Sequence, residues 1–253
     1  MLNVGENIVV VAGAMIASIF FEVWLNRIWP WEDRRPCNEL IGWQLSVLGT
    51  TYAVILGFML YTVWTALGEA DLNADLEASA VVDLHHMSAG LPEPQRTKLQ
   101  TLARSYADTV IRRDWPQMAR GEELEETSAI DREMWDTVMS VRPASAIEIT
   151  AQQNALVQLA SLDQHRLTRM LQSHKSLPKV LWCVLLVGGT LTVISACTFG
   201  MENRKLQMLQ VVSFSLLVSL TLVAIADIHR PFHGLIHVRH DAFLRAQQSM
   251  QNR

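Results

Sequence analysis

The stretch LSVLGTTYAVILGFMLYTVWTAL, residues 45–67, decides the fold of this chain. It contains no charged residue, and as an α-helix it is long enough to cross the roughly 30 Å of hydrocarbon in a bilayer. Three further apolar runs occupy residues 8–25, 180–199 and 208–226. Backbone amides and carbonyls must be satisfied internally in lipid, so each run is expected to be a helix. The sequence therefore predicts an all-α integral membrane protein with four transmembrane helices.

The composition agrees with a membrane protein. The chain has 253 residues, of which 50% are hydrophobic and 18% charged, and its formal net charge is −4. Soluble domains usually carry about a quarter charged residues. These values exclude an ordinary cytosolic enzyme, a disordered chain and a nucleic-acid-binding protein. Three cysteines are also too few and too scattered for a disulfide framework or a zinc ribbon.

An even number of spans places both termini on one face of the membrane. We divide the chain into spans one and two (1–67), a helical extramembrane stalk or cap (68–177), spans three and four (178–228) and an extramembrane tail (229–253). The first run lacks a basic start and a small-residue cleavage site, which favours a retained span over a signal peptide. Basic residues near the spans number seven on the termini face and five in the short loops, which favours cytoplasmic termini. The seven are Arg166, Arg169, Lys175, Lys179, Arg230, Arg239 and Arg245, and the five are Arg27, Arg34, Arg35, Arg204 and Lys205.

The region between spans two and three is expected to be helical, with breaks at residues 90–94, 115–116, 121 and 142–143. Residues 69–87 continue the second helix and carry an apolar stripe that needs a partner. Helices are also predicted over 95–113 and 146–175, and the tail after residue 234 is expected to pack against this stalk. Pro231 and Gly234 should end or bend the last helix. The stripe consists of Leu72, Leu76, Ser79, Val82 and His86.

The second run places Gly49, Ala53 and Gly57 at intervals of four residues, with threonines nearby. One interpretation is a helix that packs closely around a symmetric pore and turns hydroxyls toward water. The other is close helix packing within one subunit, which faces of small residues favour in general.

The segment from residue 36 to residue 95 contains no lysine or arginine. Around a symmetry axis, Glu69, Asp71 and Asp75 would form carboxylate rings just outside the membrane, and such rings attract cations. The alternative is an ordinary solvated helix face.

Several other polar residues are candidates for function. Glu22 lies inside the first span, where a carboxylate is either functional or reaches toward Arg27 at the interface. Asp163 is expected to form an ion-pair network with Arg166 and Arg169. The remaining candidates are histidines at helical spacing that would bind zinc or copper or titrate together, unless they belong to a polar, partly buried tail. They are His229, His233, His237 and His240.

No enzymatic motif stands out. The chain has no metalloprotease helix motif, nucleophile elbow, phosphate-binding glycine loop or paired-cysteine motif. We therefore expect neither an enzyme nor a cofactor.

Five segments of the chain resemble the bacterial bestrophin-like family, in the same order along the sequence. They are GTTYAVILGF (49–58), EAD (69–71), Tyr106 with RDWP (113–116), LDQHR (162–166) with Arg169, Leu177, Pro178 and Trp182, and DIHRPFHG (227–234). Together they cover about residues 45–243.

The resemblance implies a fold and a function. Bestrophins are pentameric ion channels with four spans, a large cytosolic helical region and a second span that lines the pore around a hydrophobic neck. By analogy the chain would be a homo-oligomer, with a pentamer favoured, in the bacterial inner membrane, with lipid and permeating inorganic ions as its other partners. The predicted pore-lining residues are Thr50, Thr51, Val54, Ile55, Phe58, Tyr61 and Thr65.

A second hypothesis rests on what the chain lacks. It has no clear counterpart of the bestrophin neck motif or calcium clasp. The alternative is therefore a non-conducting membrane sensor or scaffold that uses the helical stalk and the histidine-rich tail.

Overall fold

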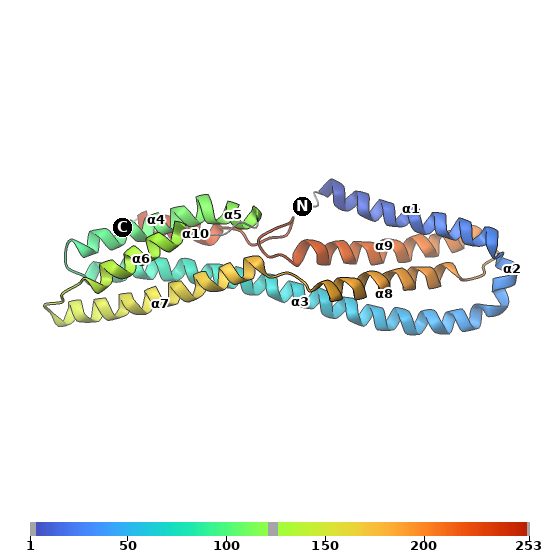
Figure 1. The fold of residues 1–253 in the computed structure, drawn as a ribbon, viewed down its shortest axis with the longest axis horizontal. Helices are drawn as coiled ribbons and strands as arrows, with labels where there is room; N and C mark the ends of the chain where they lie inside the picture. Colours follow the sequence, from blue (N-terminus) through green and yellow to red (C-terminus); the bar gives the residue numbers. More distant parts are fainter. Residues whose placement is uncertain (1–3, 121–125, 252–253) are drawn as a thin grey trace. The chain divides into compact units, whose positions relative to one another are not determined.

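The computed structural model describes residues 4–120 and 126–251, and within these ranges the chain forms helices and no β-strand (Figure 1). The all-α fold predicted from the sequence is thus confirmed. The helices are α1 (Val4–Ile28), α2 (Trp31–Arg34), η1 (Arg35–Cys37), α3 (Asn38–Met87), η2 (Ser88–Gly90), α4 (Gln95–Thr109), η3 (Val110–Asp114), α5 (Trp115–Arg120), α6 (Glu126–Met139), α7 (Ala146–His174), α8 (Lys179–Cys197), α9 (Arg204–Ile228) and α10 (Asp241–Gln251).

The chain divides into two compact units. The membrane unit comprises Met1–Thr65 and Ser176–His229, and the extramembrane unit comprises Ala66–Lys175 and Arg230–Arg253. Four helices, α1, α3, α8 and α9, are long and apolar enough to cross a bilayer. Helices α1, α3 and α9 each contain a predicted run and extend beyond it at both ends, whereas α8 ends at Cys197, two residues before the end of its predicted run.

In the membrane unit, α3 packs against bare backbone of α8. The Tyr52 hydroxyl donates a hydrogen bond to the Leu185 carbonyl at 2.9 Å. A Cβ added at Gly188 would lie 2.6 Å from the Tyr52 ring, and one at Gly189 would lie 2.8 Å from its hydroxyl oxygen. The two glycines therefore make room for the aromatic side chain.

The connections at the ends of these spans are held together by polar contacts. Asn38 donates to the Gly200 carbonyl and accepts from its amide, both at 2.9 Å. Arg34 is fully buried, donates to the Cys197 carbonyl at 2.6 Å and also bonds Asn26. Its guanidinium lies 3.7 Å from the carboxylate of Glu22, which is itself 1% exposed. The expectation that Glu22 reaches toward Arg27 is therefore wrong, because the carboxylate turns inward to a second arginine.

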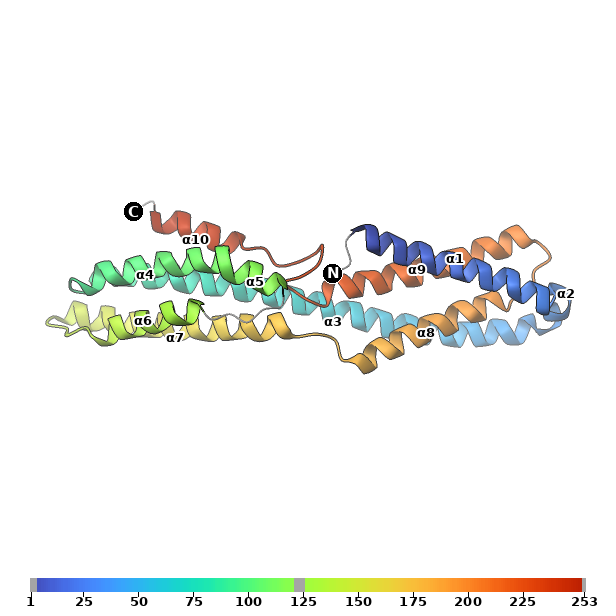
Figure 2. The ribbon, with the colours of Figure 1, turned by 45° about the horizontal axis from the view of Figure 1, so that its top comes forward.

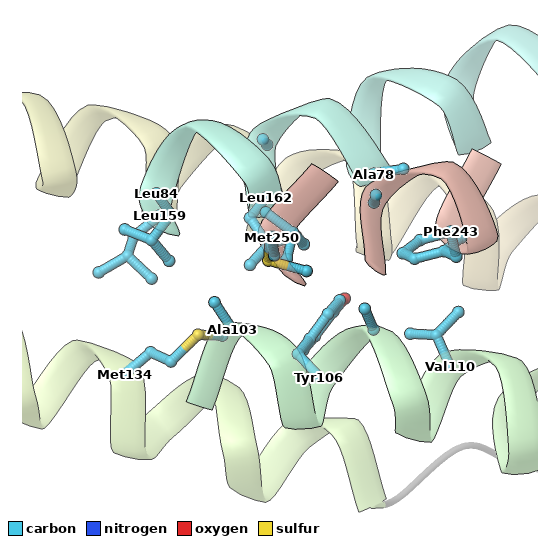
Figure 3. Packing of buried hydrophobic residues seen from close by; sticks show 14 of the residues in the cluster. Ala78, Leu84, Ala103, Tyr106, Val110, Met134, Leu159, Leu162, Phe243 and Met250 are labelled. Carbon is cyan, nitrogen blue, oxygen red and sulfur yellow. The ribbon is translucent and has the colours of Figure 1, made fainter. Parts of the chain in front are cut away.

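The extramembrane unit has a continuous hydrophobic core contributed by the second half of α3 and by α4, α6, α7 and α10 (Figure 3). Ala103 and Tyr106 of α4 face Leu159 and Leu162 of α7 in this core, while α10 adds Phe243. The buried positions of α4 and α7 recur every three or four residues, which is the spacing of one helix face.

The C-terminal segment packs against the stalk, as predicted. Helix α10 lies alongside α4 (Figure 2), and Arg104 of α4 donates to the Met250 carbonyl at 3.0 Å. Before α10, the Trp115 indole donates to the Val238 carbonyl at 3.1 Å. Helix α9 ends at Ile228, and Gly234 adopts a φ of 93°, a left-handed conformation that side chains disfavour.

The break expected at residues 115–116 is wrong. A π-helical segment, η3, links α4 directly to α5, and the wider turn accommodates Pro116 without ending the helix. The break expected at Gly121 lies outside the described residues.

The predicted apolar stripe of α3 is not the face that the chain itself buries. Leu72 and Leu76 are 60% and 43% exposed, and the core instead receives a stripe dominated by small residues. Small side chains let neighbouring helices approach α3 closely, which larger leucines would prevent. The buried stripe consists of Ala70, Ala74, Glu77, Ala78 and Val81.

Candidate functional site

The predicted pore-lining residues lie on one face of α3 in the membrane unit. The buried side of this stretch is marked by Tyr52 and Val63, which are 5% and 3% exposed. At about 100° per residue, Val54, Phe58 and Tyr61 point to the opposite side. All three are more than half exposed. Thr50 and Thr51 are also exposed, whereas Ile55 and Thr65 are half-buried.

Small residues on α3 do not pack within the chain at two of the three predicted positions. A Cβ added at Gly49 or Gly57 would meet no heavy atom within 4 Å. Close packing inside one subunit therefore does not account for these two glycines.

The predicted acidic rim divides into two kinds of residue. Glu69 and Asp71 are exposed on α3. Asp75 is partly exposed but accepts from Arg245 of α10 at 2.7 Å. The cation of Arg245 offsets the charge of Asp75, so Glu69 and Asp71 are the stronger candidates for a site that acts on mobile ions.

A buried ionic network lies in the extramembrane unit and was only partly anticipated. The Arg169 guanidinium contacts Glu77 of α3 at 2.7 and 3.0 Å and Asp114 of η3 at 3.0 Å. All three side chains have no exposed surface. The Tyr106 hydroxyl donates to Glu77 at 2.7 Å, and the Thr127 hydroxyl donates to Asp114 at 2.9 Å. One arginine of α7 thereby joins elements that are distant in sequence.

The electrostatics of this network favour a charged arginine. Burial alone would disfavour the cation, but the charge and hydrogen bonds of Glu77 outweigh it and raise the pKa of Arg169. Burial raises the pKa of Asp114, and Arg169 opposes that rise. Burial and the adjacent Glu77 raise the pKa of Tyr106 well above its ordinary value, which keeps the phenol protonated as a donor.

Asp163 does not join Arg169, which corrects the predicted network. It accepts from the Trp135 indole at 3.0 Å and shares a hydrogen bond with Asp131 of α6. Burial, this hydrogen bond and the charge of Asp163 raise the pKa of Asp131 to about 7. Arg166 instead donates to the hydroxyls of Thr127, at 3.4 Å, and Ser128.

The tail histidines do not share a helix, because α9 ends before His229 and α10 begins after His240. His229 Nδ1 lies 2.7 Å from the Ala226 carbonyl oxygen, and His237 Nδ1 lies 3.0 Å from that of Gly234. Across residues 4–120 and 126–251, no three His, Cys, Asp or Glu side chains gather where they could hold a metal ion. Metal binding by His229, His233, His237 and His240 stays a prediction without a formed site.

Comparison with models of known protein families shows which family this chain is related to. The profile of the Bestrophin-like domain matches residues 10–243. The chain belongs to the bestrophin-like family. The resemblance seen in the sequence is thereby confirmed.

Solved structures of bestrophin homologues share this bestrophin-like fold. A variant of a bacterial bestrophin homologue from Klebsiella pneumoniae is 13% identical, with a TM-score of 0.73 over 97% of this chain and 99% of that one. A second variant of the homologue is 14% identical, with a TM-score of 0.72 over 97% of both chains. A zinc-phased structure of the homologue gives 14% identity and a TM-score of 0.70 over 97% of both chains. Among curated proteins, no sequence matches the chain.

Sequence reasoning missed two features of this bestrophin-like chain. No role was predicted for Glu77, although its spacing from Ala70, Ala74 and Val81 places it on the small-residue face of α3. Arg34 was counted as a loop charge. The sequence of the connection carries no signal for its burial, since its partners come from α1 and α8.

Proposed function

We propose that the chain forms an oligomeric ion channel whose pore is lined by the membrane part of α3. The observation that supports this proposal most is the uncovered face of α3, where Val54, Phe58 and Tyr61 remain exposed in a single chain. Membership of the bestrophin-like family and the fold shared with bacterial bestrophin homologues support the same function. In this proposal the aromatic and aliphatic side chains form a hydrophobic constriction, a kind of gate that acts by excluding water.

The proposed channel also assigns each part of the chain to the membrane or to the cytoplasm. Residues 1–67 and 178–228 form the membrane part, and residues 68–177 and the tail (229–253) lie in the cytoplasm of a bacterial cell below its inner membrane. A pentamer would bring the open Gly49 and Gly57 against neighbouring subunits, where small residues let helices approach. Mass photometry and electron microscopy of the purified protein test this directly. A closed ring with α3 on its axis is expected, whereas a monomer or dimer without an axial opening contradicts the proposal.

Replacing Phe58 with alanine is expected to increase ion flux into proteoliposomes severalfold, because it widens and wets the hydrophobic constriction. Flux of Na⁺ and Cl⁻ is measured with the wild-type protein and the variant at equal protein density. The matched control is Phe20→Ala, which removes a phenylalanine of similar exposure from α1, 72% against 65% for Phe58. Background flux for both the wild type and Phe58→Ala would contradict conduction and favour the alternative of a non-conducting sensor or scaffold.

Neutralising the exposed rim is expected to reduce selectivity for cations. The double variant Glu69→Gln with Asp71→Asn removes two carboxylates per subunit that attract cations from solution. Reversal potentials in a Na⁺ and Cl⁻ gradient should shift toward the anion, most strongly at low salt because the charges are exposed. Asp75→Asn should shift them less, since Arg245 already offsets that carboxylate. An equal shift for both would contradict the assignment of Glu69 and Asp71.

A further inference from the structure

The membrane unit contains an apolar cavity among α1, α8 and α9, the helices that pack together in this unit (Figure 1). Its volume is about 590 Å³, which falls within the range of about 300–1,000 Å³ that is usual for ligand pockets. Its walls include Ala14 and Phe21 of α1, Trp182 and Val193 of α8, and Ala226 of α9.

Three hydroxyls in the cavity walls are already bonded to carbonyls of their own helices. The Ser18 hydroxyl donates to carbonyls of its own helix at 2.9 Å. The hydroxyls of Thr190 and Ser219 do the same at 2.8 and 2.6 Å. Water needs two to four polar partners to stay in a buried site, and these walls offer it few. The natural occupant is therefore hydrocarbon.

The cavity is deeper than one leaflet of a bilayer. Its lining runs from Trp182 to Ile194 along α8, which is about 18 Å of helix at roughly 1.5 Å per residue. Half of a hydrocarbon core of about 30 Å is about 15 Å. The lining begins near the start of α8 and reaches Ala226, two residues before the end of α9. On α8 the lining also ends three residues before Cys197, so the cavity reaches past the middle of the bilayer, and its outer end lies on the side where α8 begins and α9 ends.

A positive charge stands at the outer end of the cavity. Lys179, the first residue of α8, is exposed and lies on the same helix face as Leu186 and Thr190, seven and eleven residues later. Three residues further along α8, the rings of Trp182 and His229 lie nearly perpendicular, with their centres 5.6 Å apart. A lysine ammonium and the positive end of the α8 dipole complement an anionic headgroup.

We propose that this cavity binds one acyl chain of an anionic phospholipid, with the phosphate beside Lys179 and the chain between α1, α8 and α9. The site would make the phospholipid a structural ligand of the subunit, and it does not depend on whether the channel conducts.

The test uses the full-length protein in nanodiscs that contain phosphatidylglycerol with a photoreactive acyl chain. After irradiation, mass spectrometry maps lipid adducts along the chain. Adducts are expected to concentrate on the lining residues of α1, α8 and α9. Ala14→Phe fills the cavity and should lower adducts on the α8 segment severalfold. The matched control is Ala12→Phe, at an exposed position of the same helix that does not line the cavity, and it should leave them unchanged.

A second variant tests the headgroup without altering the packing of the helices. Lys179→Glu should lower adducts with phosphatidylglycerol severalfold and leave the melting temperature of the protein unchanged. Native mass spectrometry of the protein purified from membranes should find a retained phospholipid. A retained free fatty acid in its place would overturn the proposal. So would adducts spread evenly over exposed residues such as Ile16 and Phe20, or adducts that persist in both Ala14→Phe and Lys179→Glu.

Discussion

Replacing Arg169 with methionine is expected to destabilise the extramembrane unit by about 3–5 kcal/mol. The substitution keeps a long side chain but leaves the carboxylates of Glu77 and Asp114 buried without their shared cation. It also removes a guanidinium that lies 5.6 Å from the ring of Trp115 in the same core. Thermal unfolding of the full-length protein in detergent measures the loss, and hydrogen exchange in α6 and α7 locates it.

Arg245→Met is the matched control for this prediction. Arg245 also bonds an aspartate of its own unit at 2.7 Å, but both side chains are about half exposed or more. Exposed pairs contribute about 1 kcal/mol or less, because water and salt screen them. Equal losses for Arg169→Met and Arg245→Met would show that the buried network does not hold α3, η3 and α7 together.

The contact between Glu77 and Arg169 could not be predicted from the sequence. Apolar periodicity predicts the four spans and most of the buried face of α4, because each helix needs one face against a neighbour. On α7 it fails in part, since Leu167 and Leu171 are 57% and 65% exposed whereas Arg169 is buried. It does not say which helices are neighbours. Glu77 and Arg169 are separated by 92 positions, and Glu77 stands among exposed acidic residues, so their contact appears only in the folded chain. The same limit applies to α3, whose small residues rather than its leucines enter the core.

For the candidate pore face, the sequence predicts which span is involved but not the direction in which its side chains point. Residues 45–67 identify the span, and the resemblance to bestrophins selects its residues. The direction that Phe58 and Tyr61 face follows only once Tyr52 is seen against α8. In the proposed channel this exposed face meets other subunits, and a single sequence carries no direct record of such a contact.

The carboxyl pair of Asp131 and Asp163 should make the extramembrane unit sensitive to pH. The pKa of Asp131 is about 7 in the folded chain, against an ordinary value near 3.8. Between these values the folded state binds a proton that the unfolded state has released, so stability is greatest at low pH and falls as pH rises toward 7. The expected loss is a few kcal/mol at most, since each unit of difference in pKa corresponds to about 1.4 kcal/mol and the two carboxyls titrate as a pair.

The charged surroundings of this pair oppose the loss only in part. Arg166 of α7 and Arg132 of α6 both favour an ionised Asp131, yet burial and Asp163 outweigh them. On the other packed sides of α6, Glu133 is paired with Lys98 of α4 at 2.8 Å, and Thr127 is bonded to Asp114 of η3. Lys98 is therefore already paired with Glu133, and Thr127 carries no charge, so neither stabilises an ionised Asp131.

Asp131→Asn isolates the effect of this proton, because the amide still donates a hydrogen bond to Asp163 but does not titrate. Melting temperatures of the full-length wild type and variant are compared from pH 4.5 to pH 8. The advantage of the variant should grow as pH rises to about 7 and then stay constant, since above that pH the folded wild type holds two carboxylates side by side. Asp136→Asn, which neutralises an exposed carboxylate of the same helix, should show no such growth. A constant difference between Asp131→Asn and the wild type across this range would mean that the two aspartates do not share a proton.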